Sequence, residues 1–525
     1  MFVKKIVFLL LLFVPFVFNA QSNNSQDNFK CGISQQTAAI IKQRLMDNRQ
    51  LYNKQEVKDL MTNRVITYIP LSIHNVAGDA NGLGKTSEQT ILGFLCGLNA
   101  IYADQDVQFF IHNSIRNHVS TYIYNNAATS TSRAHMLRYK INNTLNLIIG
   151  SSALNQVASW YDGFGDFIFL LQSMLTTQAK TEAHEIGHFF TLPHTFYGWE
   201  SMDAEATYGG QNVPSTVGSG WSAFSPETVP RSGGQSNCSW ASDGFCDTEA
   251  DYYSDRTNCP YNPTMNDRYG NALNPDETNM MSYALDHCVD NFSSEQQTAM
   301  AIDIASRSWV TNTPNSTADV TGVATAVSPQ NNGQLGSVSN ATVRLDWSDV
   351  SGATWYYLEV IGTMIPGLWL PNTSDVIFKG IIYTGSYYDL STTELVAGNH
   401  YAWRVKAINA SSTCAGISSY YSFEAVTSVT AIKDLPIEKQ MSFKVNSNPI
   451  STSFIPLSVY AAVDVLGSIK IFSMDGREVL AVNKQIISQG HSLVQIPAGH
   501  LPNGMYTAVL ITDRGQLQQK LIIQK

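Results

Sequence analysis

The chain has 525 residues, of which 44% are hydrophobic and 14% charged, and its formal net charge is −10. This length is too great for one hydrophobic core and predicts about three folded units. The negative charge, without any basic run, argues against a nucleic-acid partner.

Residues 1–20 have the pattern of a signal peptide. Lys4 and Lys5 form a charged start, and Ile6–Phe18 is an apolar core too short for a comfortable membrane span. We expect cleavage after Ala20 and no transmembrane segment in the mature chain. The sequence therefore predicts an exported protein.

Residues 21–63 are predicted to be a propeptide, because the segment is rich in Gln and Asn and has little to bury. A helix-like stretch is expected at Ile40–Met61. The segment contains one cysteine, Cys31, followed by a glycine. Its thiolate could occupy the open coordination site of a downstream zinc enzyme and hold it latent. An idle thiol in a disordered tail is the alternative.

Residues 64–312 are predicted to form an α/β domain. A helix is expected to open at Ser87 and Glu88 and to run through Leu98. β-Branched and aromatic runs predict strands at Val65–His74, Asp106–His112, Asn146–Gly150 and Asp166–Leu171.

The stretch Thr181–Phe196, TEAHEIGHFFTLPHTF, is the candidate active-site element. Residues four apart lie on one face of a helix, so His184 and His188 can aim at a shared Zn²⁺. Glu185 would lie beside the pair, where it could take a proton from a water on the metal. A surface helix with two solvated histidines is the alternative for this motif alone.

His194 is the candidate third ligand. It reaches the same metal only if the helix stops soon after Phe190, and Leu192-Pro193 favours such a stop. A downstream glutamate, Glu200 or Glu205, is the alternative third ligand.

The segment between Phe196 and Asn279 is rich in Gly and Ser. Four of the seven cysteines cluster in this segment and just after it, and they allow three disulfide connectivities; they are Cys238, Cys246, Cys259 and Cys288. Its acidic residues could supply oxygen donors for Ca²⁺, or form a solvated acidic loop; they are Asp243, Asp247, Glu249, Asp251 and Asp255. Cys96 lies in an apolar run upstream and is predicted to be a buried thiol.

A second motif, Asn279-Met280-Met281-Ser282-Tyr283, follows and precedes Cys288 and a helix-like stretch at Ser293–Ile304. With the histidine motif, it resembles the metzincin clan of zinc endopeptidases, and within the clan the pappalysin-like family. The resemblance covers roughly residues 64–310. It implies a zincin-type α/β fold, His184, His188 and His194 as zinc ligands, and Glu185 as general base and acid. It also implies Met281 as the methionine beneath the metal and Tyr283 as a stabiliser of the oxyanion.

Further roles are implied by the same resemblance. Relatives bind structural calcium near the segment that matches Asp243–Thr248, so Asp243, Asp247 and Thr248 are the candidate ligands. Relatives that cut beside basic residues line the S1′ pocket with an acidic side chain at the place of Asp286. Relatives with a leader often carry Cys-Gly there, which favours Cys31 as a latency switch.

The sequence departs from the clan at Thr191, where a glycine is usual. That position makes a sharp turn, so Thr191 would either adopt the left-handed conformation at a cost of about 1–2 kcal/mol or form a different turn.

Two β-sandwiches are predicted after this domain. A linker at 313–322 leads to residues 323–427, where strands are expected at Val343–Trp347, Tyr356–Val360 and Tyr401–Ala407. This part resembles fibronectin type III domains, and we interpret it as a passive spacer or a substrate-gripping module. A second linker, at 428–438, follows.

Residues 439–525 carry strand patterns at Ile469–Phe472, Leu493–Ile496, Met505–Thr512 and Leu517–Ile523. Asn448-Pro449, Met474-Asp-Gly476-Arg477 and Leu501-Pro-Asn-Gly504 resemble a type IX secretion sorting domain. The resemblance implies the type IX machinery as a partner and export from a Bacteroidetes-type bacterium, with the product secreted or anchored at the surface.

The sequence therefore predicts a secreted zinc endopeptidase that acts on proteins or peptides, with a preference for Arg or Lys at P1′. A non-catalytic surface adhesin on a degenerate peptidase scaffold and a gluzincin-type peptidase are the alternatives.

Overall fold

The computed structural model describes residues 30–50, 66–151, 157–200, 202–219, 223–253, 257–310, 318–336, 342–363, 371–426, 441–512 and 515–525. The chain divides into two compact units. The first comprises Met1–Val65, His74–Lys85 and Asn117–Val310, and the second comprises Ile66–Ile73, Thr86–Arg116 and Thr311–Lys525. The predicted signal peptide and the linker at 428–438 lie outside the described residues.

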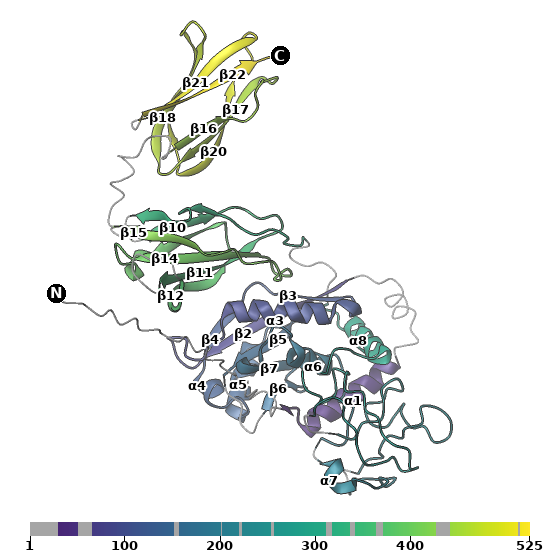
Figure 1. Cartoon of the computed structure of the whole chain (residues 1–525). Coiled ribbons are helices and arrows are strands. Elements are labelled where there is room, and N and C mark those ends of the chain that lie inside the picture. The colour runs from purple at the N-terminus through teal and green to yellow at the C-terminus, as the bar shows by residue number, and fades with distance from the viewer. Residues whose placement is uncertain are drawn as a thin grey trace, which may run out of the picture. The chain divides into compact units, whose positions relative to one another are not determined.

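A mixed seven-stranded sheet organises the N-terminal part of the chain (Figure 1). Its order is β1-β6-β7-β5-β2-β3, with β4 paired to β2. The strands are β1 (Lys30–Cys31), β2 (Thr67–Ala77), β3 (Val107–Ile111), β4 (Arg116–Val119), β5 (Leu145–Gly150), β6 (Val157–Asp162) and β7 (Phe167–Leu171). β5 runs parallel to β7, and β2 runs parallel to β3, whereas β6 is antiparallel to β7. The strands expected from the sequence are confirmed to within a few residues.

The first unit also contains helices. They are α1 (Gln35–Arg49), α4 (Thr121–Asn125), α5 (Ser130–Tyr139), α6 (Lys180–Phe189), α7 (Ala204–Tyr208) and α8 (Ser294–Ser306). α6, which carries the histidine motif, packs against β6 and β7. α8 begins with a capping box in which Ser293 and Gln296 bond each other's backbone N–H groups.

The helix expected at Ile40–Met61 overlaps α1, and its residues 51–61 lie outside the described part of the chain. α1 begins at Gln35, because Ser34 accepts a hydrogen bond from the N–H of Thr37 and caps the helix, and it ends at Arg49. Arg44 bonds Asp303 of α8 at 3.0 Å, and Lys42 donates to the carbonyl of Ser242. The helix α1 is therefore packed and ion-paired, whereas the composition of residues 21–63 indicates little to bury.

The second unit contains α3 (Glu88–Ile101) and a sandwich of two sheets. One sheet has the order β13-β10-β8 and the other β12-β11-β14-β15-β9. The strands are β8 (Ala326–Ser328), β9 (Gly333–Gly336), β10 (Thr342–Trp347), β11 (Trp355–Thr363), β12 (Pro371–Ile382), β13 (Tyr387–Ser391), β14 (His400–Ile408) and β15 (Tyr421–Val426). Trp347 and Trp403 are fully buried in its core.

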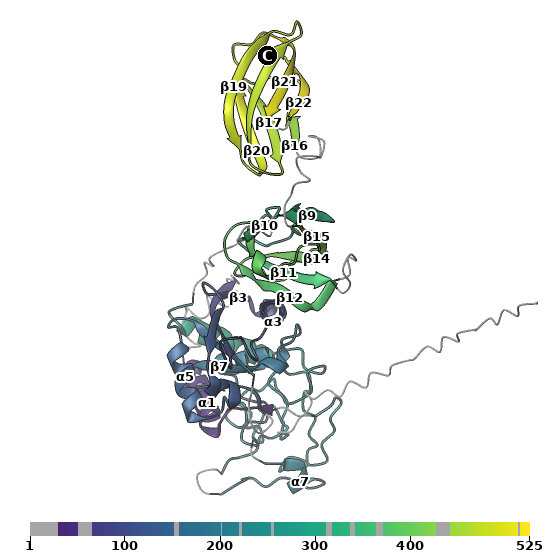
Figure 2. The ribbon, with the colours of Figure 1, turned by 90° about the vertical axis from the view of Figure 1, so that its left-hand side faces the viewer.

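The C-terminal segment forms two more sheets, with the orders β16-β17-β20 and β19-β18-β21-β22 (Figure 2). The strands are β16 (Met441–Val445), β17 (Phe454–Ala461), β18 (Val465–Ser473), β19 (Glu478–Ile487), β20 (Gly490–Pro497), β21 (Gly504–Thr512) and β22 (Gly515–Ile523). The chain is thus multidomain, with a mixed α/β region followed by sandwich-like sheets. Among the described helices, none has the length and apolar character needed to cross a membrane.

Candidate metal centre

Three histidines converge at the end of α6. His184 and His188 project from the helix, and His194 comes from the turn after it. Their ligand-type nitrogen atoms all lie within 4.8 Å of one another, and Nε2 of His188 lies 3.2 Å from Nε2 of His194. All three side chains are buried. The structure therefore brings together the three candidate zinc ligands.

The other ring nitrogen of each histidine faces an oxygen. Nδ1 of His184 bonds the carbonyl of Met280 at 2.8 Å, and Nδ1 of His188 bonds the carbonyl of Leu192 at 2.7 Å. A carbonyl only accepts, so these Nδ1 atoms carry the proton, and in a neutral ring Nε2 keeps its lone pair. Nδ1 of His194 lies 3.5 Å from Oε1 of Glu200.

The electrostatics of the site favour neutral rings. Burial, followed by the neighbouring His194 and His184, lowers the pKa of His188 far below its usual value. Burial and His184 do the same to the pKa of His194. Three buried imidazoles whose ring nitrogen atoms converge are a donor set that fits Zn²⁺.

The turn that brings His194 back is a left-handed cap. The N–H of Leu192 bonds the carbonyl of Gly187, and the N–H of Thr191 bonds the carbonyl of His188. This is the Schellman pattern, in which the residue after the cap is usually glycine. Thr191 occupies that place with φ of 70°, so the strained alternative is the one that this turn adopts.

Met281 and Tyr283 lie directly against the histidines. A Cβ on Gly187 would lie 2.5 Å from Sδ of Met281, so the missing side chain makes room for the thioether. The carbonyl of Met281 accepts from the N–H of Thr195, next to the third histidine. The ring of Tyr283 lies 4.9 Å from that of His194, edge to face. The motif at 279–283 is thus beside the histidine cluster.

Glu185 is on the same helix as two of the histidines, and Asp286 lies close enough to that helix to act on Glu182. Glu185 is buried on α6 between the two helical histidines. Asp286 is half-buried, and its charge helps to raise the pKa of Glu182, which burial raises to about 8. Glu182 is two residues before His184, so Asp286 lies near the start of the histidine motif.

The candidate calcium residues are only partly together. Oδ1 of Asp243 accepts from the N–H of Phe245 and from Oγ1 of Thr248, at 3.0 and 3.2 Å. Asp247 instead accepts from Oγ of Ser293 and the N–H of Glu295, both at 2.7 Å, and so caps α8. The structure therefore separates Asp247 from the other two, and calcium binding stays a prediction.

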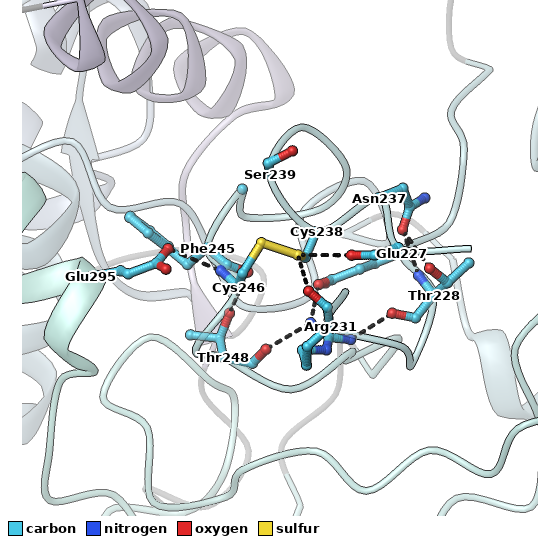
Figure 3. The surroundings of a disulfide bond; sticks show 12 residues. Glu227, Thr228, Arg231, Asn237, Cys238, Ser239, Phe245, Cys246, Thr248 and Glu295 are labelled. Atoms are coloured by element: carbon cyan, nitrogen blue, oxygen red, sulfur yellow. Dashed lines mark hydrogen bonds and ion pairs between the residues drawn. A yellow bond between two sulfur atoms is a disulfide. The ribbon is translucent and has the colours of Figure 1, made fainter. Parts of the chain in front are cut away.

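The clustered cysteines form two bonds between sequence neighbours, Cys238–Cys246 and Cys259–Cys288. Figure 3 shows the first of them, where Arg231 bonds Glu227 and the carbonyl of Thr248. A histidine, His287, lies close to the second bond, but disulfide sulfurs are not thiolate ligands.

The prediction of a free thiol at Cys96 is wrong. Cys96 is bonded to Cys414, which is 318 residues away. Cys31 lies in β1, opposite Ser159 of β6, and its side chain lies outside the description.

Three groups lie at the Nδ1 atoms of the candidate zinc ligands, and the sequence did not predict this role for any of them. The carbonyls of Met280 and Leu192 carry no sequence signal, because every residue has one. Glu200 had been named only as an alternative ligand. It lies at the Nδ1 side of His194 and is absent from the three-histidine cluster, and Glu205 bonds Thr264.

Comparisons with known proteins concern mainly the C-terminal part. Residues 447–524 match the family model described as a secretion system C-terminal sorting domain. A search of the curated proteins finds no match, and no peptidase family is among the matches.

Solved structures resemble the chain in part. The fibronectin domains 1–3 of chicken CNTN1 match at 16% identity with a TM-score of 0.13, covering 40% of this chain and 65% of that one. A tetra-tandem repeat of a large adhesion protein matches at 13% identity with a TM-score of 0.14, covering 41% and 50%. The chain thus spans less than two thirds of either protein. The sorting domain indicates that this chain is exported by the type IX secretion machinery to the cell surface or the exterior of a Bacteroidetes-type bacterium.

Proposed function

We propose that the chain is a secreted zinc-dependent endopeptidase of the metzincin type. The observation that carries the proposal is the convergence of three buried imidazoles, two of which direct their Nδ1 protons to backbone carbonyls outside the cluster. His184, His188 and His194 would hold the ion. Zn²⁺ there supplies a Lewis acid that lowers the pKa of water and polarises a carbonyl.

The chain's own residues would do the rest of the chemistry. Glu185, next to His184 on α6, would accept a proton from the attacking water and deliver it to the leaving amine. Tyr283, whose ring faces His194, would donate a hydrogen bond to the oxyanion. The carbonyls of Met280 and Leu192 would hold two imidazoles in the tautomer that offers Nε2.

Two finer parts of the proposal concern regulation and specificity. Cys31 lies in β1 at the edge of β6, the strand against which α6 packs, so the leader is folded onto the same unit as the site. We keep Cys31 as the proposed latency switch and Asp286 as the proposed determinant of a basic P1′ residue.

The test combines metal content with peptide cleavage. Purified chain should hold one zinc per molecule and cleave casein after leader removal. Glu185→Gln should keep the zinc and lose cleavage, and Glu205→Gln, whose carboxylate bonds Thr264, is the matched control that should keep both.

Each unexpected result of these measurements would favour a different alternative. Cleavage retained in Glu185→Gln would remove the assigned base. Zinc without cleavage in the unaltered chain would favour the adhesin alternative. Zinc retained in His194→Ala but lost in Glu200→Ala would favour a gluzincin-type site.

A further inference from the structure

The helix α3 makes contacts on two faces, which indicates two partners. Ile91, Phe94, Leu95 and Leu98 form one buried stripe, at helical spacing. Leu92 is also fully buried, although it points about 100° away from Ile91 on the helical wheel. A helix that buries residues on more than one face is covered on more than one side.

The second stripe of α3 consists of Glu88, Leu92 and Cys96, each four residues from the next. Oε2 of Glu88 accepts from the N–H of Ile381 at 2.5 Å. The carbonyl of Leu92 accepts from Oγ1 of Thr413 at 3.1 Å.

The third residue of the stripe completes this contact. Cys96 is bonded to Cys414. All three residues therefore meet the sandwich β8–β15, and α3 and β12 lie side by side in both views (Figures 1 and 2).

The strand β3 meets the same part of the sandwich. β3 is the last strand of its sheet, and the N–H of Ile111 donates to the carbonyl of Ala410 at 2.8 Å. Nε2 of Gln108 donates to the carbonyl of Ser411 at 3.1 Å, and the N–H of Ile115 donates to the hydroxyl of Tyr383. An edge strand with open N–H and C=O groups can pair with other chains, and here the sandwich covers part of the outer edge of β3.

The sandwich loop at 409–414 is shaped for this contact. Ala410, Ser411 and Thr413 are buried, which is unusual for a loop. The Oδ1 atom of Asn409 accepts from the N–H groups of Ser411 and Ser412, and its amide donates to the carbonyls of Ala318 and Gly352. Asn409 thus fixes the loop from within the sandwich.

We infer that the sandwich β8–β15 holds α3 and β3 in place. The loop 409–414 contacts both elements, and the disulfide Cys96–Cys414 links the sandwich covalently to α3. We call this arrangement the clamp. The partner of the sandwich is a surface of the same chain: the Glu88–Leu92–Cys96 stripe and the outer edge of β3. This role differs from both a passive spacer and a substrate-gripping module. It does not depend on the proposed peptidase activity.

The test uses the full chain with a site for a sequence-specific protease inserted between Asn312 and Thr313. The bond is removed with Cys96→Ala and Cys414→Ala, the insert is cleaved, and the product is passed over a sizing column. The clamp predicts that the two pieces still elute together. Separation of the pieces would show that only the disulfide joins them and would overturn the inference.

A second measurement covers the case in which the double variant does not fold. Thr413→Ala in the intact chain removes the buried bond to Leu92, and Thr393→Ala, which removes a local bond to Ser391, is the matched control. Amide hydrogen exchange of 88–101 and 107–111 should be at least tenfold faster in Thr413→Ala than in Thr393→Ala. Equal exchange in the two variants would contradict the clamp.

Discussion

Oε1 of Glu200 lies 3.5 Å from Nδ1 of His194, while its Oε2 accepts from the N–H of Gly198 at 2.8 Å. The carboxylate is therefore held by the backbone beside the one candidate ligand that has no carbonyl at its Nδ1. Carboxylates in this position orient a metal-bound imidazole and raise its basicity. Burial raises the pKa of Glu200 to about 7.

We expect Glu200→Gln to weaken zinc binding by about 10–100-fold, because the variant keeps the shape but loses the negative charge. Competition with a chromogenic chelator measures the affinity. Glu205→Gln serves as the control, since Glu205 bonds Thr264 instead. Equal affinities in the two variants would show that Glu200 does not support His194.

Thr191→Gly should stabilise the first unit by about 1 kcal/mol, because a β-branched residue at φ of 70° is strained and glycine is not. Thr191→Ala is the control, since it removes the same buried methyl and hydroxyl but keeps the Cβ. The free energy of unfolding is measured in urea for the glycine and the alanine variant. A glycine variant no more stable than the alanine variant would mean that the turn carries no strain.

The spacing of the histidine motif predicted most of the metal centre, because helix geometry fixes which residues share a face. The stop after Phe190 was also predictable, since Pro193 follows it closely. The conformation of Thr191 was not, because a threonine leaves both turn types open. The Nδ1 partners were hidden for another reason: two are backbone carbonyls, and one of those, from Met280, comes from a segment 96 residues away.

Contacts between segments far apart in the chain were the second feature that the sequence could not predict. Strand and helix patterns gave the elements near their true bounds. The apolar run around Cys96 predicts burial, which is confirmed for Leu92 and Leu95. The disulfide to Cys414 is a contact across 318 residues, and local pattern holds no information about it. The packing of α1 was hidden for the same reason, since the charges of Lys42 and Arg44 meet partners on distant segments.

Gly187→Ala should destabilise the first unit by about 1–3 kcal/mol, because the new methyl would lie 2.5 Å from Sδ of the fully buried Met281. Met281→Ala alone should cost about 2–5 kcal/mol through the cavity it leaves. In the double variant the clash is absent, so its loss should be smaller than the sum. Urea denaturation of the four proteins gives this coupling, and additive losses would show that Met281 does not fill the space at Gly187.

Asp286→Asn should abolish a preference for Arg or Lys at P1′, since it removes a half-buried negative charge beside Glu182. The measurement is kcat/KM for matched peptides with Arg or Leu at P1′. Asp290→Asn, at an exposed position that bonds Asn291, is the control and should leave the ratio unchanged. A ratio that is the same in both variants would exclude Asp286 from the S1′ pocket without touching the assignment of the metal ligands.

Asp251 gives a pH prediction. It is buried and accepts from Oγ1 of Thr195 at 2.6 Å, and burial raises its pKa to about 6. In the unfolded chain the pKa is about 3.9. Between these values the folded state holds the proton and the unfolded state has lost it. The contribution of Asp251 to the free energy of unfolding is therefore full below about pH 4 and falls as pH rises to about 6.

Asp251→Asn should remove this dependence, because the amide does not titrate and can still accept from Thr195. Relative to the unaltered chain, the variant should gain about 2 kcal/mol between pH 4 and pH 7. Urea denaturation at both pH values measures the difference, and Asp79→Asn, at an exposed turn, corrects for the general effect of losing a carboxylate. A difference that stays constant across this range would mean that Asp251 is ionised in the folded protein at both pH values, with its burial offset by the bonds from Thr195 and from the N–H of Tyr253.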